Sequence, residues 1–104
     1  MRVTITARHI VVPENFKELL LEKLPKLEHF GYEILGLHAI FGKERYFYTA
    51  EITLKIKGSI LAAKAKDERD LLTCVEEAMM KLKEQLRRHE SKRAERRRRT
   101  SHRP

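Results

Sequence analysis

Hydrophobic and polar residues alternate along residues 2–8 and again, more cleanly, along residues 48–58. This period of two is typical of strands with one buried face. Residues 34–41 are mostly apolar and predict another strand between these two. Val3, Ile5 and Ala7 share the apolar face of the first strand, and Ala50, Ile52, Leu54 and Ile56 are expected to point inward from the third. In the middle strand Leu37, Ala39 and Phe41 lie in one phase and His38 and Ile40 in the other.

A hairpin is expected at Gly58-Ser59, which can form a two-residue turn with glycine at the first central position. Residues 60–66 then return as a fourth strand, and in this register Thr53 lies opposite Lys64. The outward face of the hairpin would carry four lysines: Lys55, Lys57, Lys64 and Lys66.

Two other stretches have the helical period of 3.6 residues. Pro13 can open the first helix and Gly31 can end it, and the second begins near Asp67 or Asp70. The apolar stripe of the first is Phe16, Leu20, Leu24 and Leu27; that of the second is Leu71, Leu72, Val75, Ala78, Met79, Leu82 and Leu86. Beyond Leu86 the stripe positions hold His and Arg, so a longer helix has no apolar face to bury.

These elements follow in the order strand, helix, three strands, helix. A helix joins the first two strands, which can therefore be parallel, and hairpins continue the sheet antiparallel. Each helix has one apolar stripe, so both must share the apolar face of the sheet. The predicted fold is a two-layer α+β domain, β-α-β-β-β-α, with a four-stranded mixed sheet, two helices packed on one face and a polar opposite face.

Size and composition favour a single folded domain. A chain of 104 residues can build one core, and 37% charged residues predict a heavily ionised surface. The single cysteine, Cys74, cannot form an internal disulfide, and the N-terminal residues lack the apolar run of a signal peptide or a membrane span. A cytoplasmic location is expected.

The sequence contains no motif for catalysis or for metal binding. It has no glycine-rich phosphate loop, no HExxH and no paired cysteines. The five histidines are scattered, and Cys74 has no neighbouring base in the sequence, so packing is its expected role. We expect a protein that is not an enzyme and that uses no metal, cofactor or small-molecule substrate.

Positive charge is concentrated at one end of the chain. Residues 81–104 contain eleven Lys or Arg and three Glu, so their net charge of +8 equals that of the whole chain. This asymmetry favours a polyanionic partner. We expect a folded domain over residues 1–92 and a basic tail over residues 93–104 that is flexible without a partner.

The cations of the predicted helices fall into rows that can line a groove. Such a groove attracts phosphates because their counterions are released, and Arg adds a planar fork for phosphate oxygens. The candidate nucleic-acid-binding residues are Lys23, Lys26 and His29 in the first helix, and Lys81, Arg88 and Lys92 in one row and Lys83 and Arg87 in another row of the second.

Several alternatives stay open at this point. Any one cation can belong to a solvated face paired with Glu22, Glu77 or Glu84, although three Glu cannot neutralise the eleven cations of the last 24 residues. An anionic membrane is disfavoured because the stripe of the second helix is needed for the core. The aromatic residues 46–48 can stack on bases but are more typical of strand packing.

The order of the elements and two segments resemble a known family. The segments are KLPKLEHF at the end of the first helix and KDERDLLTCVEEAMMKLKEQLRRHESK over the fourth strand and the second helix. They resemble the bacterial ribosome hibernation promoting factors and ribosome-associated translation inhibitors, also labelled sigma-54 modulation proteins. The resemblance covers residues 1–92, and the chain has the length of the family's short form.

The resemblance implies a protein that binds the small ribosomal subunit and its rRNA in the channel for mRNA and for A-site and P-site tRNA. Bound there, it would inhibit translation and preserve idle ribosomes under stress. The chain departs from the family pattern at several of its positions. His29 stands where family members commonly have Lys, and Leu72 stands where they frequently have Tyr. Glu84 stands where they commonly have a cation, and the adjacent Lys83 can substitute for it. The rRNA contacts that the resemblance implies are Lys23, Lys26 and His29, and Lys81, Glu84 and Arg88.

A second hypothesis is a regulatory adaptor, a transcription-factor modulator. It would bind a protein through the polar sheet face and owe nonspecific nucleic-acid affinity to its tail. Partner binding would then survive removal of the tail and of the helix cations, whereas ribosome binding would not.

Overall fold

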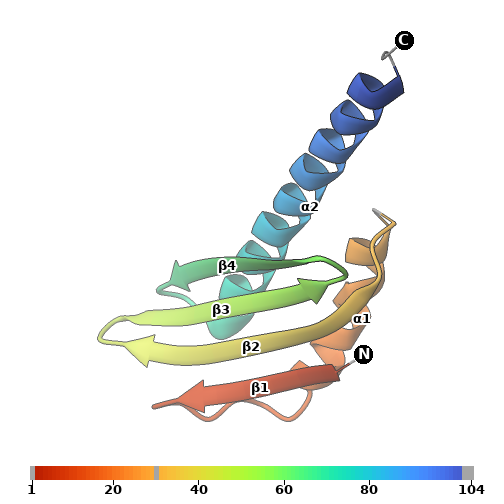
Figure 1. Ribbon diagram of the computed structural model, residues 1–104. Coiled ribbons are helices and arrows are strands. Elements are labelled where there is room, and N and C mark those ends of the chain that lie inside the picture. The colour runs from red at the N-terminus through yellow and green to blue at the C-terminus, as the bar shows by residue number, and fades with distance from the viewer. Residues whose placement is uncertain (1, 30, 102–104) are drawn as a thin grey trace.

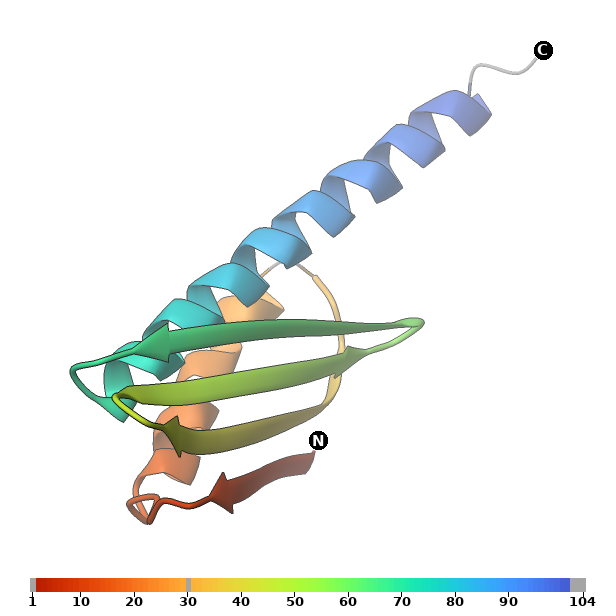
Figure 2. The same ribbon diagram turned by 90° about the vertical axis from the view of Figure 1, so that its left-hand side faces the viewer.

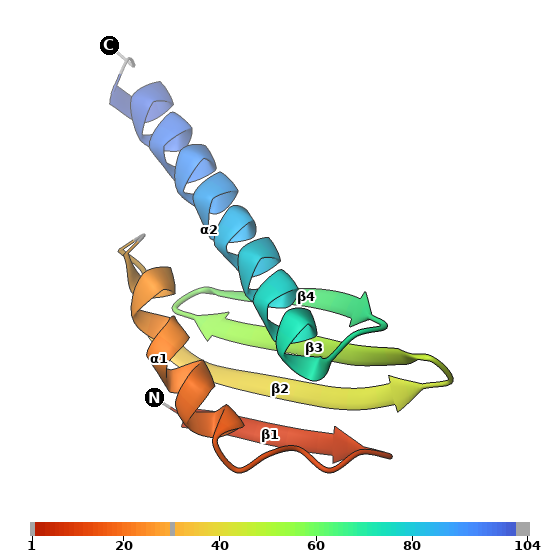
Figure 3. The same cartoon turned by 180° about the vertical axis from the view of Figure 1, so that it is seen from behind.

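The computed structural model describes the backbone of residues 2–29 and 31–101 and the side chains of residues 2–29 and 31–89. The strands form one sheet in the order β1-β2-β3-β4, with β1 and β2 parallel and the other pairs antiparallel (Figure 1). Both helices lie on the same face of this sheet (Figure 2 and Figure 3). The predicted α+β fold is confirmed. Its elements are β1 (Arg2–Arg8), α1 (Phe16–Glu28), β2 (Ile34–Glu44), β3 (Phe47–Ile56), β4 (Ser59–Asp67) and α2 (Leu71–Ser101).

The core lies between the sheet and the two helices. The Phe16 ring of α1 packs edge-on against Phe41 of β2, with ring centroids 5.7 Å apart. The largest fully buried side chains are Leu20, Leu24, Leu27, Phe41, Ile52, Leu54, Ile56, Cys74, Val75, Leu82 and Leu86. Burying each of the larger aliphatic side chains is worth about 1.5–3 kcal/mol, so this layer fixes where both helices lie.

Two residues expected in the core are exposed. Burial falls along β1 from Val3 to Ala7, because β1 is an edge strand of the sheet. Leu72 is 41% exposed because, at about 100° per residue, it lies to one side of the stripe through Val75 and Leu82.

Helix α1 begins at Phe16, three residues after Pro13. The Phe16 amide donates to the Pro13 carbonyl at 3.1 Å, so Pro13 belongs to a turn that precedes the helix. Pro25 lies inside α1 on its exposed side. Proline has no N–H to donate to the carbonyl one turn earlier, and on the exposed side of the helix water can donate to that carbonyl instead. After the helix, Gly31 adopts φ of +80° and its amide donates to Glu28 at 2.9 Å, as expected for a residue that ends a helix.

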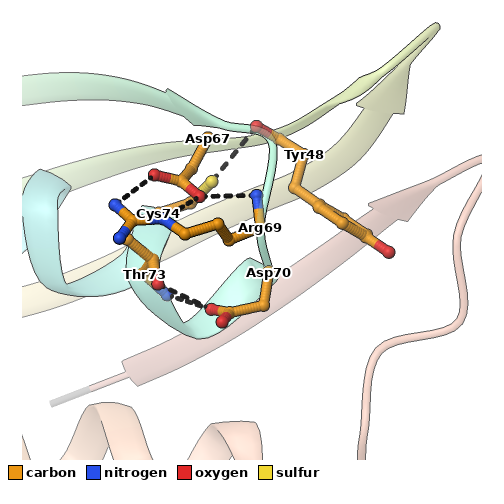
Figure 4. Close-up of polar contacts among 6 residues, drawn as sticks. All are labelled: Tyr48, Asp67, Arg69, Asp70, Thr73 and Cys74. Atoms are coloured by element: carbon orange, nitrogen blue, oxygen red, sulfur yellow. Dashed lines mark hydrogen bonds and ion pairs between the residues drawn. The ribbon is translucent and has the colours of Figure 1, made fainter.

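The start of α2 is fixed by side chains around Asp70 (Figure 4). An Asp70 carboxylate oxygen accepts hydrogen bonds from the Thr73 amide at 2.7 Å and the Thr73 hydroxyl at 2.8 Å, so Asp70 caps the helix. Just before it, the Asp67 carboxylate accepts from the Arg69 amide and guanidinium. In the first turn, the Cys74 thiol donates to the Tyr48 carbonyl of β3 at 3.1 Å and ties the helix to the sheet.

The β3–β4 hairpin differs from the predicted register by two residues. Ser59 pairs with Ile56, so Lys57 and Gly58 form the turn and Thr53 lies opposite Ala62, not Lys64. Gly58 has φ of +85°, so the glycine takes the second central position of the turn. A shift of two keeps every side chain on its predicted face, because side chains alternate with a period of two.

Helix α2 continues well past the sheet (Figure 1). Its backbone is helical to Ser101 and so includes Lys92 and most of the predicted tail. The side chains of residues 90–104 lie outside the described residues. The flexibility of residues 93–104 without a partner stays a prediction.

The Asp70 cap predicts a pH-dependent stability. The hydrogen bonds from Thr73 hold the pKa of Asp70 below its ordinary value of 3.8, so this carboxylate stabilises the fold above that pH and the contribution is lost as pH falls through the lower folded pKa. Asp70→Ala should lower the thermal midpoint by a few degrees at pH 7. Asp70→Asn should retain most of the midpoint, because Asn also caps, and should lack this acid dependence. Thermal melts by circular dichroism between pH 2 and pH 7 measure the midpoints of both variants. An unchanged midpoint in Asp70→Ala would contradict the role of Asp70 as the cap of α2.

Candidate nucleic-acid interface

A groove of about 360 Å³ lies between α1 and α2 on the side of the helices away from the sheet core. Its bottom is apolar, because Leu27 and Met79 are almost fully buried there. Three ammonium groups and a single carboxylate surround it. The lining residues are Lys23, Lys26 and Leu27 from α1 and Glu76, Met79, Met80 and Lys83 from α2.

The apolar stripes of the helices decide which cations reach this groove. Lys23 and Lys26 lie one turn apart and beside the buried Leu24 and Leu27, so packing of α1 turns them toward α2. On α2, Lys83 follows the buried Leu82 and lies about 100° around the helix from it, on the flank that faces α1.

The three groove lysines are not neutralised by carboxylates. The ion pairs between described residues involve neither Lys23, Lys26 nor Lys83. On the opposite sheet face, by contrast, Lys64 lies 3.9 Å from Glu51 and Lys66 lies 3.5 Å from Glu44. The charges of Lys23, Lys26 and Lys83 are therefore available to an anionic partner, as is that of Lys55 on the sheet face, which is in none of these ion pairs.

Arg87 and Arg88 share one carboxylate. Arg87 lies 2.6 Å and Arg88 3.5 Å from Glu84, and the bonded Arg87 guanidinium holds the pKa of Glu84 below its ordinary value. Both arginines are largely exposed, and one carboxylate leaves a net positive charge on this turn of α2. The expected pairing of cations with Glu84 is thus found here.

Lys81 does not line the groove, which corrects the predicted arrangement of the rows. It lies about 100° from Leu82 in the other direction, beside the edge strand β4. Its ammonium donates to the Lys64 carbonyl at 2.6 Å, and the Gln85 amide one turn later donates to the Ala62 carbonyl at 2.7 Å. Both contacts cover an edge strand, where carbonyls otherwise remain open to other strands.

The other candidate residues have different positions. His29 is the C-terminal cap of α1 and is not among the groove-lining residues. The side chain of Lys92 lies outside the described residues. Tyr46, for which strand packing was expected, is 80% exposed in the β2–β3 turn, and Tyr48 packs partly against the core under Lys43, whose ammonium lies 5.2 Å from its ring centroid.

Met80 was not singled out by sequence reasoning. It is 71% exposed and lines the groove beside Lys83. The available signal was its place outside the apolar stripe, three residues before Lys83 on the same flank of the helix.

The remaining chemistry of the described residues is structural. Cys74 is fully buried, and burial raises its pKa to about 11, so its thiol stays protonated at neutral pH. Residues 2–29 and 31–89 include no cluster of His, Cys, Asp or Glu arranged to hold a metal ion. Within the part of the chain described, no helix has a stretch apolar and long enough to span a bilayer.

The fold and the groove define a class of protein: a small two-layer α+β domain with a groove between its helices that is lined by three lysines. Residues 3–94 match the family described as Sigma 54 modulation protein / S30EA ribosomal protein, and the chain belongs to this family. The predicted family of ribosome-associated, non-enzymatic proteins is confirmed.

Relatives and solved structures agree with this membership. The ribosome hibernation promoting factor of Pseudomonas putida is 30% identical over 92 residues, which cover 88% of this chain and 89% of that protein. The protein of the same name from Escherichia coli is 26% identical and is covered to 96%. A ribosomal subunit interface protein from Coxiella burnetii has the same fold, with a TM-score of 0.76 at 24% identity over 88% of this chain and 99% of that one. The N-terminal domain of Protein Y from Thermus thermophilus gives 0.75 at 19% identity, over 86% and 99%.

The different positions of Lys81 and Lys83 predict different effects of the same substitution. Lys83→Gln should lower affinity for RNA severalfold and leave stability unchanged, because Lys83 lines the groove. Lys81→Gln should lower the free energy of unfolding by about 1 kcal/mol, because it removes the donor to the Lys64 carbonyl, and should affect RNA affinity less. Urea unfolding measures the change in stability, and fluorescence anisotropy measures the change in RNA affinity. If both substitutions lowered RNA affinity equally, the placement of Lys83 in the RNA site and of Lys81 outside it would be contradicted.

Proposed function

We propose that this protein is a translation inhibitor that docks on the rRNA of the small ribosomal subunit in bacterial cytoplasm. Bound there, its folded body occludes the mRNA channel and the A-site and P-site tRNA positions. The observation that carries the proposal is the set of three unneutralised lysines, Lys23, Lys26 and Lys83, around one groove. The printed names of the relatives, ribosome hibernation promoting factor and ribosomal subunit interface protein, support a ribosomal partner.

Inhibition by this route is steric and requires no chemical step. The cations supply affinity because each phosphate they neutralise releases condensed counterions, and this gain does not depend on base sequence. The packed core supplies the rigid body that competes for space with mRNA and tRNA. A protein without catalytic or metal-binding residues can perform both tasks.

The C-terminal part of the chain extends the basic surface in this proposal. We assign residues 1–92 to the ribosome-binding domain and residues 93–104, with six Arg and one Glu, to a tail that engages phosphates beside the main site. We assign Arg87, Arg88 and Lys92, which precede the tail along the chain, to the same RNA-binding surface, together with His29 and Lys81.

The proposal predicts ribosome binding that depends on salt and on the groove lysines. The wild-type chain should co-sediment with small subunits at low salt and dissociate as salt rises. In the variant Lys23→Gln/Lys26→Gln/Lys83→Gln, affinity should fall at least tenfold. Affinity falls as salt rises, and a plot of log affinity against log salt should become less steep by about two in this variant. The reason is that three lysines are lost and about 0.7–0.9 ions are released per phosphate neutralised.

The matched control is Lys55→Gln/Lys64→Gln/Lys66→Gln, which removes the same charge from the opposite sheet face. It should sediment with subunits like the wild type and should still inhibit a cell-free translation reaction. Loss of subunit binding in this control alone would contradict the proposal, because it would place the ribosomal contact on the sheet face. Absence of the wild-type chain from ribosomal fractions at low salt would refute the proposed function.

A further inference from the structure

We propose that the groove between α1 and α2 takes an unpaired nucleobase of RNA, held against Met80 while Lys23, Lys26 and Lys83 contact the flanking phosphates. This inference rests on the proposed RNA-binding function and names the kind of RNA that the groove fits: a single strand or a loop with a base turned out of its stack.

The apolar character of the groove is the first argument. Met80 is 71% exposed, and such an unbranched thioether beside three ammonium groups offers a polarisable surface to a flat ring. Below it, Leu27 and Met79 close the groove with apolar atoms. A duplex presents its charged backbone to a binding surface and would leave Met80 uncovered. A base turned out of a single strand has an apolar face that can cover Met80, the one of these three side chains that is largely exposed.

The charges in the groove are the second argument. The three lysines surround the apolar centre, and Glu76 lies in the same lining. This carboxylate repels a phosphate at its own position, whereas it can accept a hydrogen bond from the amino group of a base. Phosphates are therefore favoured beside the lysines and a base beside Glu76 and Met80.

The size of the groove is compatible with this ligand. Its volume of about 360 Å³ falls in the range of roughly 300–1,000 Å³ that is usual for small-ligand pockets. On the other face of the sheet, the hollow beside Arg8 is lined by Lys64 and Lys66, whose ammonium groups already lie near Glu51 and Glu44. A hollow of similar size beside Arg2 and Lys55 also carries exposed apolar side chains, Leu35 and Ile60. The helical groove differs in placing three ammonium groups around one exposed methionine.

The test separates the base from the phosphates. The full-length chain is titrated at low salt with three labelled RNAs of ten nucleotides: an adenine strand, a strand of equal length and charge without bases, and a duplex. The adenine strand should bind at least twofold more tightly than the abasic strand, because contact of a thioether with an aromatic ring contributes roughly two- to tenfold in affinity. The duplex carries twice as many phosphates, so its affinity is compared at equal phosphate concentration and should then be below that of the adenine strand.

Variants identify the residue that holds the base. Met80→Gln should lower affinity for the adenine strand roughly two- to tenfold and leave the abasic strand and the thermal midpoint unchanged. Lys83→Gln should weaken both strands alike. The matched control is Ile60→Gln, another exposed apolar residue, 66% exposed on β4, which should change neither.

Equal affinity for the adenine and abasic strands, no effect of Met80→Gln, preference for the duplex, or no binding of any strand would each overturn the nucleobase site. The proposed function is tested separately, by co-sedimentation with small subunits. If the RNA titrations fail to show a base site, but Met80→Gln sediments with small subunits and the triple lysine variant does not, the ribosome-binding proposal stands without a base in the groove.

Discussion

The arrangement of this protein depends on one apolar layer between the two helices and the sheet. Leu24 and Leu27 of α1 and Leu82 of α2 are almost completely buried in it. Each of them is next to a groove lysine in the sequence. Because these leucines face the sheet, each helix has one flank toward the other helix, and Lys23, Lys26 and Lys83 lie on that flank. Hydrophobic burial therefore positions the charges, and no ion pair between described residues is required to hold them there.

The distribution of carboxylates then separates the basic surfaces. On the sheet face, Lys64 and Lys66 each have an acidic neighbour across the strands, and such exposed pairs leave little net field. Between the helices, three lysines share the groove with Glu76 alone. The overall excess of positive charge favours an anionic partner, and the groove gathers three of the lysines that are in no ion pair between described residues.

The fold follows from periodicity, while parts of the site do not. Alternation in residues 48–58 and the stripe from Leu71 to Leu86 gave the correct elements, faces and topology, because burial enforces both patterns. The hairpin register was wrong by two residues, since a glycine at position 58 fits either central position of a turn and alternation cannot distinguish them. The row containing Lys81 could not be assigned to a flank from the sequence, because the spacing of a row does not state which side of the stripe faces α1; the structure places Lys81 beside β4. Met80 was missed because an exposed methionine has no distinctive pattern in sequence.

The central claim is that the groove lysines, and not those of the sheet face, meet the ribosome. Amine-reactive labelling followed by mass spectrometry, with and without bound small subunits, tests it on the unmodified chain. The account predicts that Lys23, Lys26 and Lys83 are protected from labelling in the complex, while Lys55, Lys64 and Lys66 react as they do in the free protein. Protection of the sheet-face lysines with continued reactivity in the groove would contradict it.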